Sequence, residues 1–154
     1  MPNTYTQLYI HFVFAVLERR SLIRNEWKHD LYRYMTGIVQ MNNHKLIAIN
    51  GMPNHIHVFI GYNPNQLIPD LLQNLKRDSC KWINENKFSK LPFNWQSGYG
   101  AFSYSQSQID DVIKYIMNQE IHHKKTTFRE EYIALLKRFN INYDERYILQ
   151  DYDE

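Results

Sequence analysis

The chain has 154 residues, which is enough for one domain with a buried core. Its 18 Lys and Arg residues against 16 Asp and Glu leave a formal net charge of +2, and 15% of its residues are aromatic. This composition excludes a disordered, strongly charged tail, which would be poor in aromatic residues. The net charge neither requires nor excludes a polyanionic partner, so any nucleic-acid binding must depend on local patches and on stacking.

The first half of the chain predicts three strands and a helix. Residues 6–16 alternate in polarity, which is typical of a strand. Residues 24–42 have apolar side chains at helical spacing. Residues 45–50 and 55–62 are two further strands, and the turn-forming residues at 50–54 join them into a hairpin with a loop of about five residues.

The second half predicts a helix, an extended segment and two more helices. Leucines and isoleucines at helical spacing indicate a helix over 67–86, in which a proline is tolerated because it falls in the first turn. Residues 93–103 read as extended. Ser105 opens a possible capping box, with a glutamine three residues later, and a helix over 105–122 follows it. Residues 128–139 predict a further short helix.

This order of elements predicts the fold class. The pattern β-α-β-β-α-β followed by helices is that of an α+β, ferredoxin-like or RRM-like sandwich. In that sandwich, a four-stranded antiparallel sheet carries helices on one face, and the other face is available for a site. RNA-recognition modules stack bases on aromatic side chains of that second face. We therefore expect a single domain spanning residues 1–154.

Cysteine usage and hydropathy bear on the compartment. The lone cysteine, Cys80, forms no internal disulfide, and thiolate zinc fingers are excluded. The first residues lack the charged and apolar regions of a signal peptide. No apolar run approaches the roughly 18 residues that a membrane span requires. We expect a soluble cytoplasmic protein with no membrane partner.

Two histidines on the predicted strand 55–62 are candidate metal ligands. His55 and His57 are two residues apart, so their side chains share one face of the strand, while Ile56 and Val58 face the core. Neutral imidazole is the commonest metal ligand in proteins. Taken alone, such a pair is more often two hydrogen-bonded histidines, but the turn before it and the apolar back face favour a site. His11, on the first strand, is expected nearby.

The predicted helix 105–122 carries a candidate nucleophile. Its apolar residues form one stripe, and Tyr115 and Gln119 lie off that stripe, four residues apart and therefore adjacent. A phenol is a weak nucleophile until a base or a local charge assists it. Since the chain has 12 tyrosines, periodicity alone favours a packing or surface role for Tyr115.

Together, these segments resemble a known family. The segments at 10–14 (IHFVF), 52–58 (MPNHIHV), 95–103 (WQSGYGAFS) and 115–119 (YIMNQ) look like four motifs, in the same order, of the small HUH single-tyrosine transposases of bacterial insertion sequences. REP-associated tyrosine transposases are among these proteins. The likeness extends over about residues 5–140 and leaves a short C-terminal tail.

The resemblance implies a chemistry and its residues. His55 and His57 would ligate Mg²⁺ or Mn²⁺, with Gln119 as the third ligand; manganese accepts imidazoles more readily than magnesium does. Tyr115, on the C-terminal catalytic helix, would cleave and rejoin single-stranded DNA at insertion-sequence ends through a 5′-phosphotyrosine intermediate. The resemblance further implies recognition of DNA hairpins near the element ends and a homodimer whose active sites are shared between subunits.

Basic and aromatic residues suggest where DNA would bind. Tyr9, Phe59 and Tyr99 are candidates for stacking on bases. Basic clusters that could contact phosphates follow the first strand, lie on the second helix and follow the catalytic helix: Arg19, Arg20, Lys76, Arg77, Lys81, Lys124 and Lys125. For each cluster taken separately, a solvated face is the commoner explanation.

Two other functions fit the same residues. The first is a non-catalytic, domesticated module that binds DNA hairpins, although all four residues implied in catalysis are present. The second is a metal-dependent hydrolase that forms no covalent intermediate. A covalent protein–DNA adduct would separate both from a transposase.

Overall fold

The computed structural model describes residues 3–17, 22–90 and 92–150. Its elements follow the predicted order, strand, helix, two strands, helix and strand, and then the C-terminal helices. In chain order they are β1 (Tyr9–Ala15), α1 (Lys28–Met41), β2 (Lys45–Met52), β3 (His55–Gly61), α2 (Ile68–Glu85), β4 (Gly100–Tyr104), η2 (Gln106–Gln108), α3 (Ile109–Met117), α4 (Gln119–His122), α5 (Phe128–Arg138) and η3 (Glu145–Tyr147).

The four strands form one antiparallel sheet. Their order is β2-β3-β1-β4, so the two strands that lie next to each other in the middle, β3 and β1, come from different parts of the sequence. This is the ferredoxin-like arrangement, and the predicted α+β fold class is confirmed. The central position of β3 gives it hydrogen-bonded neighbours on both sides, which makes it a rigid support for side chains.

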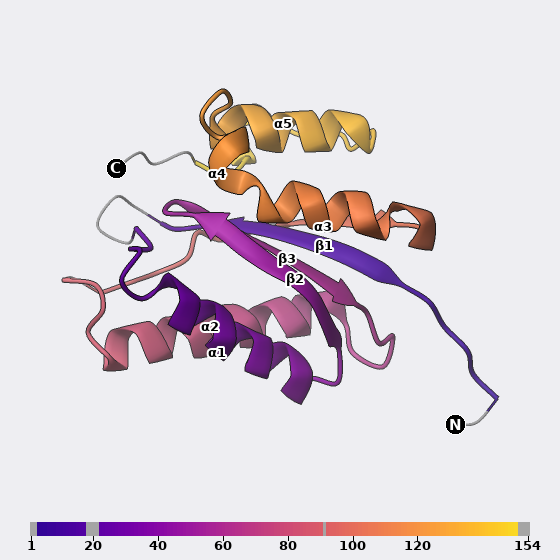
Figure 1. Cartoon of the computed structure of the whole chain (residues 1–154), viewed down its shortest axis with the longest axis horizontal. Coiled ribbons are helices and arrows are strands. Elements are labelled where there is room, and N and C mark those ends of the chain that lie inside the picture. Colours follow the sequence, from indigo (N-terminus) through magenta and orange to yellow (C-terminus); the bar gives the residue numbers. More distant parts are fainter. Residues whose placement is uncertain (1–2, 18–21, 91, 151–154) are drawn as a thin grey trace.

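Helices α1 and α2 cover one face of the sheet (Figure 1). The alternation predicted for the first strand is confirmed, because Phe12 and Phe14 point into this layer together with Ile56, Val58 and Ile60 of β3. The helices contribute a stripe of buried side chains: Leu31, Met35, Leu71, Leu72 and Leu75. The main hydrophobic core therefore lies on this side and holds the sheet in place.

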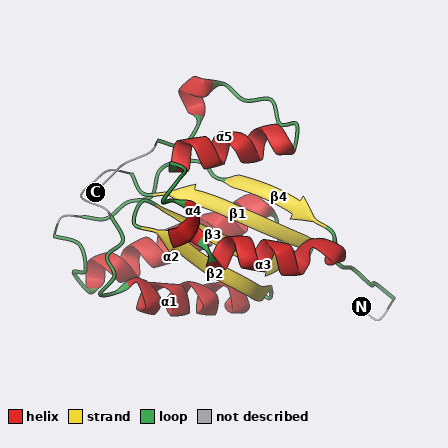
Figure 2. Ribbon diagram, turned by 45° about the horizontal axis from the view of Figure 1, so that its top comes forward, coloured by secondary structure: helices red, strands yellow, loops and turns green. Residues whose placement is uncertain are grey.

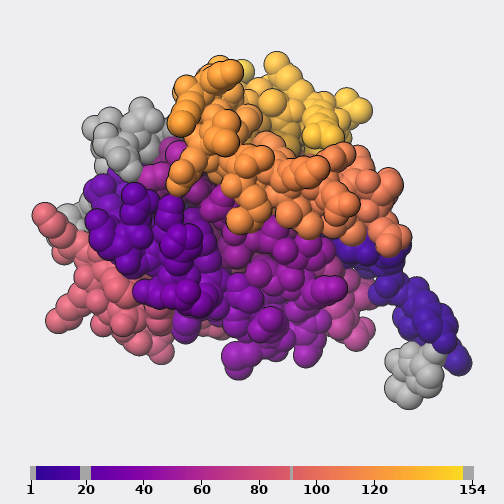
Figure 3. All heavy atoms as spheres, viewed as in Figure 1, coloured from indigo at the N-terminus to yellow at the C-terminus, as the bar shows by residue number. Residues whose placement is uncertain are grey.

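The C-terminal helices α3, α4 and α5 cover the second face (Figures 1 and 2). α3 lies over β2 and β3, where Val112 and Ile116 pack on Phe59. α5 lies over β1 and β4, where Phe128 and Tyr132 pack in the same cluster as apolar strand residues. In Figure 3 the atoms of this layer, orange to yellow, lie directly against those of the sheet. The face predicted to be available for a site is thus a covered face.

The predicted helix 105–122 is interrupted at Asn118. The capping box is confirmed, because Ser105 and Gln108 cap each other at the start of η2. At Asn118 the backbone leaves the helical region, with φ −100° and ψ 25°, and α4 begins at the next residue. Asn50 of β2 donates a hydrogen bond of 3.0 Å to the carbonyl of Ile116. This side chain satisfies an acceptor that the interrupted helix leaves open.

The hairpin before the histidines is tighter than predicted. β2 continues to Met52, which pairs with His55, so only Pro53 and Asn54 form the turn. Gly51 makes the close approach possible, because a Cβ at this position would lie 2.4 Å from the carbonyl oxygen of His55. The short turn fixes the register of β3 and hence the face on which its histidines lie.

Other differences lie at the ends of elements. Of the predicted extended segment 93–103, only the last residues join the sheet as β4, although Trp95 forms an isolated bridge with Val16. The predicted basic pair Arg19 and Arg20 lies outside the described residues. Within the described ranges, no helix is long and apolar enough to cross a membrane.

Candidate active site

His55 and His57 lie side by side on the covered face of β3. Both imidazoles are fully buried, while Ile56 between them packs into the core on the opposite face. Their ring centroids are 5.0 Å apart. The sequence predicted that the two side chains share a face, and the structure confirms this.

Hydrogen bonds at the back of each ring orient the pair. Nδ1 of His55 lies 2.7 Å from Oδ1 of Asn54, and Nδ1 of His57 lies 2.7 Å from Nε2 of His11. Such contacts fix the rotation of a ring and leave the other nitrogen for a ligand. The Nε2 atoms of both histidines are the ones that face α5. His11 of β1 is therefore a neighbour that positions His57.

Tyr115 and Gln119 reach the same place from the other layer. The Tyr115 ring stands edge-on to the His57 ring, with centroids 5.7 Å apart. Gln119 is fully buried, and its Oε1 lies 3.1 Å from Nε2 of His55. The structure thus brings together the four residues that the resemblance pointed to.

One residue at the centre of the site was not among the candidates. Glu131 of α5 is 3% exposed, and its Oε1 lies 3.2 Å from Nε2 of His55 and 3.3 Å from Nε2 of His57. Its other oxygen accepts hydrogen bonds from the Tyr115 hydroxyl and from the Gln119 amide. His123 and His122 also contact this carboxylate, at 3.1 and 3.4 Å.

A sequence signal for Glu131 exists. Phe128, Tyr132 and Leu135 are buried at positions i, i+4 and i+7 of α5, and Glu131 occupies position i+3 of the same stripe. A carboxylate on the buried stripe of a helix is unusual and marks a candidate functional residue.

Burial and charge set the protonation of the histidines and of Tyr115. Burial lowers the pKa of His55 to about 4, despite the opposing effect of Glu131. Burial also lowers the pKa of His11 well below its usual value. Both imidazoles are therefore neutral near pH 7, which is the form that binds metals. Burial, and then the negative charge of Glu131, raise the pKa of Tyr115, so its phenol is protonated here.

Glu131 is ionised in this arrangement. Burial alone would raise its pKa, but the neighbouring His57 and the close contacts with His123 and His55 outweigh that effect and lower the pKa of Glu131 well below its usual range. The site therefore combines the neutral imidazole of His55 with one buried negative charge. That donor set suits a divalent cation.

A buried atom without a partner supports the fit to a metal. Among the described residues, Nε2 of His57 is buried and makes no hydrogen bond. The ligand atoms of His55, His57 and Glu131 all lie within 4.8 Å of one another. Gln119 adds an amide oxygen beside His55. The residues present therefore fit a divalent metal ion.

A small cavity lies beside the tyrosine. It has a volume of about 120 Å³ and is bounded by Tyr115, Tyr104, Val112, Gln108 and, among charged residues, Asp111 and Arg138. The Arg138 guanidinium lies 6.0 Å from the centre of the Tyr104 ring. Arg138 is thus a basic residue that borders the same cavity as Tyr115, and it was not identified as a candidate from the sequence.

The predicted phosphate contacts Lys76, Arg77 and Lys81 belong to α2, which covers the face of the sheet opposite to α3, α4 and α5 (Figure 1). Lys76 donates hydrogen bonds to the carbonyls of Gln96 and Gly98, and burial lowers its pKa to about 8. Arg77 is exposed and pairs with Asp78 at 3.0 Å. Lys81 pairs with Glu85 at 3.8 Å. The ammonium of Lys76 therefore already has partners within the fold.

The other predicted DNA contacts have mixed surroundings. Lys124 and Lys125 are exposed in the turn that follows α4, close in sequence to the site. Phe59 is fully buried beneath α3 and has no free face for a base. Tyr99 packs against the main core, and its ring stands edge-on to Phe12.

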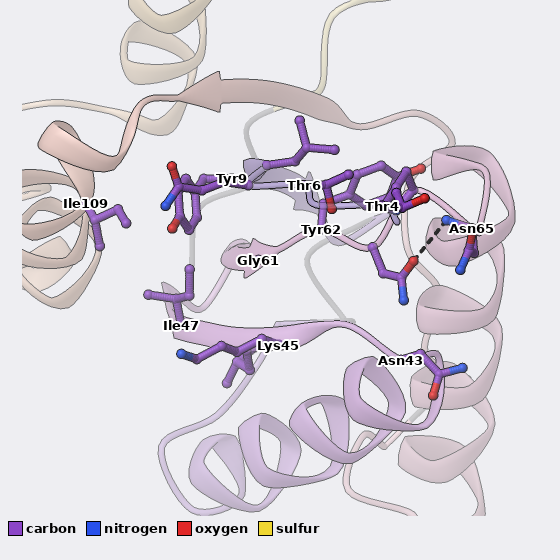
Figure 4. Close-up of a pocket in the computed structure, with 15 residues that line it drawn as sticks. Thr4, Thr6, Tyr9, Asn43, Lys45, Ile47, Gly61, Tyr62, Asn65 and Ile109 are labelled. Carbon is purple, nitrogen blue, oxygen red and sulfur yellow. Dashed lines mark hydrogen bonds between the residues drawn. The ribbon is translucent and has the colours of Figure 1, made fainter. Parts of the chain in front are cut away.

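A wider groove lies away from the histidines. Its volume is about 790 Å³, and it runs between the N-terminal segment, the start of β2 and the loop after β3 (Figure 4). Side chains that line it include Thr4, Thr6, Lys45, Tyr62 and Asn65. None of the predicted catalytic or metal residues borders this groove.

The fold and the site together define a class. The structure has a ferredoxin-like sheet with a histidine pair on a central strand, and a tyrosine from a C-terminal helix faces that pair. The family model described as "Transposase IS200 like" matches residues 4–119, which is most of the chain. The chain belongs to the family of IS200-like transposases.

Individual relatives agree with this assignment. ISDra2 transposase TnpA of Deinococcus radiodurans is 25% identical over 118 residues, which cover 73% of this chain and 84% of that protein. A crystal structure of a protein from Deinococcus radiodurans R1, described as a transposase, superposes with a TM-score of 0.61 at 25% identity, covering 75% of this chain and 93% of that one.

A REP-associated tyrosine transposase bound to a REP hairpin shares the fold. It superposes with a TM-score of 0.59 at 14% identity, covering 78% of this chain and 71% of that chain.

Proposed function

We propose that this transposase cleaves and rejoins single-stranded DNA at insertion-sequence ends through a covalent bond to Tyr115. The observation that carries the proposal is the convergence of Tyr115, Gln119, His55 and His57 from two layers of the fold. Recognition of hairpins near the element ends is part of the proposal and is supported by the related fold solved with a REP hairpin. Such a protein would act on DNA in the cytoplasm.

Tyr115 supplies the nucleophile. Its oxygen forms a bond to the scissile phosphorus, the bond from phosphorus to the 3′-oxygen breaks, and the phenol proton is transferred so that the product carries a 3′-hydroxyl. The 5′ end remains attached to the protein as a phosphotyrosine. Because the covalent bond conserves the energy of the cleaved phosphodiester, a new 3′-hydroxyl can attack it and rejoin the strand without ATP.

His55, His57 and Gln119 would hold Mg²⁺ or Mn²⁺. When bound, the ion would polarise the scissile phosphate and orient it. His11 and Asn54 orient the two imidazoles through the hydrogen bonds at their Nδ1 atoms. Glu131 holds the Tyr115 hydroxyl by a hydrogen bond in this arrangement, so the phenol must leave that partner before it attacks.

We further propose that the protein acts as a homodimer with active sites shared between subunits. In the single chain, Tyr115 faces its own His57. The interruption at Asn118 divides α3 from α4 and offers a place at which α3 could separate. Mixing a Tyr115→Phe chain with a His57→Ala chain tests the sharing. Recovery of DNA cleavage in the mixture would support it, and its absence would favour a tyrosine that acts within one chain.

The central test is a covalent adduct with DNA. Single-stranded oligonucleotides that carry the palindromes flanking the gene, labelled at the 3′ end, should become attached to the wild-type protein in the presence of Mn²⁺. Tyr115→Phe should bind the same DNA and form no adduct. Tyr147→Phe, which alters an exposed tyrosine, is the matched control and should form the adduct normally.

Two outcomes would contradict the proposal. An undiminished adduct in Tyr115→Phe would refute the assignment of the nucleophile. Hairpin binding by the wild type with no adduct and no cleavage in Mg²⁺ or Mn²⁺ would instead indicate a non-catalytic, domesticated DNA-binding module. Cleavage without an adduct would indicate a hydrolase.

A further inference from the structure

Glu131 is a buried carboxylate whose neighbours are histidines. It is 3% exposed and sits on the apolar stripe of α5. A buried charge is costly unless a countercharge or a metal compensates it. In the part of the chain that the structure describes, its ion-pair partners are His55, His57, His122 and His123, with no Lys or Arg among them. Among the described residues, no permanently charged side chain therefore pairs with this carboxylate.

The spacing of the ligand atoms suits one metal ion. Oε1 of Glu131 lies 3.2 Å from Nε2 of His55 and 3.3 Å from Nε2 of His57. Ligands bound to one ion at about 2.0–2.2 Å, in tetrahedral or octahedral geometry, lie about 2.8–3.6 Å apart. Both separations fall within this range.

The hydrogen bonds at the backs of two rings determine where their protons are. Nδ1 of His123 lies 2.7 Å from the backbone carbonyl of Thr126, which only accepts. Nδ1 of His55 lies 2.7 Å from Oδ1 of Asn54. Each Nδ1 therefore carries the hydrogen, and in a neutral imidazole the Nε2 atom is then a lone pair.

These lone pairs face other acceptors. Nε2 of His55 lies 3.1 Å from Oε1 of Gln119, and Nε2 of His123 lies 3.0 Å from that same oxygen. Oε1 of Glu131 is 3.1 Å from Nε2 of His123. The amide nitrogen of Gln119 donates to the other oxygen of Glu131, so the amide cannot be turned around without losing that bond. With both imidazoles neutral, several acceptor atoms converge here, as they would around a cation.

We propose that Glu131 is a ligand of the divalent metal ion held by His55 and His57. Two imidazoles with one carboxylate, beside the amide oxygen of Gln119, give a donor set suited to Mn²⁺, since an anionic oxygen favours hard cations. The match to the family model ends at residue 119, so α5 and its carboxylate lie outside the matched residues. The inference rests on the metal site of the proposed function.

This ligand would also connect the nucleophile to the metal. One oxygen of Glu131 faces the histidine pair, while the other accepts the hydrogen bond from the Tyr115 hydroxyl. The same carboxylate would therefore bind the ion and hold the tyrosine near it before DNA arrives.

The test is the affinity for Mn²⁺ in the absence of DNA. Free Mn²⁺ is measured from its electron paramagnetic resonance signal as the ion is titrated into the full-length protein. Glu131→Gln should weaken binding by about tenfold or more, because it removes the negative charge and one ligand atom. Glu130→Gln makes the same chemical change one residue earlier, on an exposed side chain, and should leave affinity within about twofold of wild type. His57→Ala should weaken binding as Glu131→Gln does.

One result would refute the assignment of Glu131 as a ligand, and a different result would refute the metal site itself. If Glu131→Gln binds Mn²⁺ as the wild type does while His57→Ala does not, Glu131 is no ligand, and a protonated histidine compensates its charge. If the wild type itself binds no Mn²⁺, the metal site of the proposed function fails, whatever Glu131 does. Circular dichroism in EDTA shows whether each variant is folded.

A measurement on the wild type decides the matter if Glu131→Gln does not fold. Crystals soaked in Mn²⁺ should show an anomalous peak about 2.0–2.3 Å from an oxygen of Glu131 and from Nε2 of His55 and His57. A peak bound by the two histidines and Gln119, with both Glu131 oxygens beyond contact, would refute the inference.

Discussion

Acidification should destabilise the fold through its buried histidines. His55 is fully buried, and its pKa is lowered to about 4, against an ordinary value of 6.5. Between these two values the unfolded chain binds a proton that the folded chain does not. The free energy of unfolding therefore decreases as the pH falls below about 6.5, and the decrease levels off near pH 4.

The size of the effect follows from the displaced pKa. His55 alone should reduce the free energy of unfolding by about 2 kcal/mol at about pH 5 and by about 3 kcal/mol at about pH 4, relative to neutral pH. His11, whose pKa is also lowered by burial, acts in the same direction. Glu131 has a lowered pKa, so its contribution is present above about pH 4.5 and is lost only as the pH falls further.

Urea unfolding in EDTA, followed by circular dichroism from about pH 7.5 to about pH 5, measures the effect. His55→Asn should remove about 2 kcal/mol of the pH dependence, whatever its effect on stability at neutral pH. His29→Gln, which changes an exposed histidine, should leave the dependence unchanged. A free energy of unfolding that stays constant or increases toward pH 5 would refute the reasoning. It would show that the folded site takes up protons, with Glu131 as their partner.

Three further predictions concern packing, the hairpin and the DNA surface. Ile116→Ala should cost about 2–5 kcal/mol of unfolding free energy and Ile116→Val about 0.5–1.5 kcal/mol, because this side chain of α3 is fully buried against the sheet; equal losses in urea titrations would contradict this. Gly51→Ala should cost about 1–3 kcal/mol of unfolding free energy, since its Cβ would lie 2.4 Å from the His55 carbonyl oxygen. Unchanged stability would show that the hairpin backbone shifts to accommodate the methyl group. Replacing Lys124 and Lys125 by Ala should reduce the slope of log K against log [salt] for hairpin binding by the amount expected for about two phosphate contacts, as measured by fluorescence anisotropy. An unchanged slope would show that neither lysine contacts a phosphate.

Local patterns in the sequence were sufficient for the sheet and for part of the site. The period of two in β1 correctly separated the core side chains Phe12 and Phe14 from His11. The same rule placed His55 and His57 together, because the face of a strand depends only on spacing. These predictions were correct because the face on which a strand residue lies depends only on its spacing from nearby residues in the sequence.

Long-range packing was not predictable in the same way. The break at Asn118 depends partly on a side chain of β2, Asn50, which caps the open carbonyl from 66 residues away. Glu131 reaches the histidines only because α5 folds back over β1 and β4, and no local rule specifies where a C-terminal helix docks. Its position on a buried stripe was visible in the sequence, but its partners were not.

The most direct test of the proposed function is to locate the covalent bond. The wild-type protein is incubated with Mn²⁺ and its flanking single-stranded DNA, the adduct is digested with a protease and a nuclease, and the modified peptide is sequenced by mass spectrometry. The proposed mechanism predicts a nucleotide joined through its 5′-phosphate to Tyr115. A nucleotide on any other residue, or cleaved DNA with no protein-bound fragment, would contradict it.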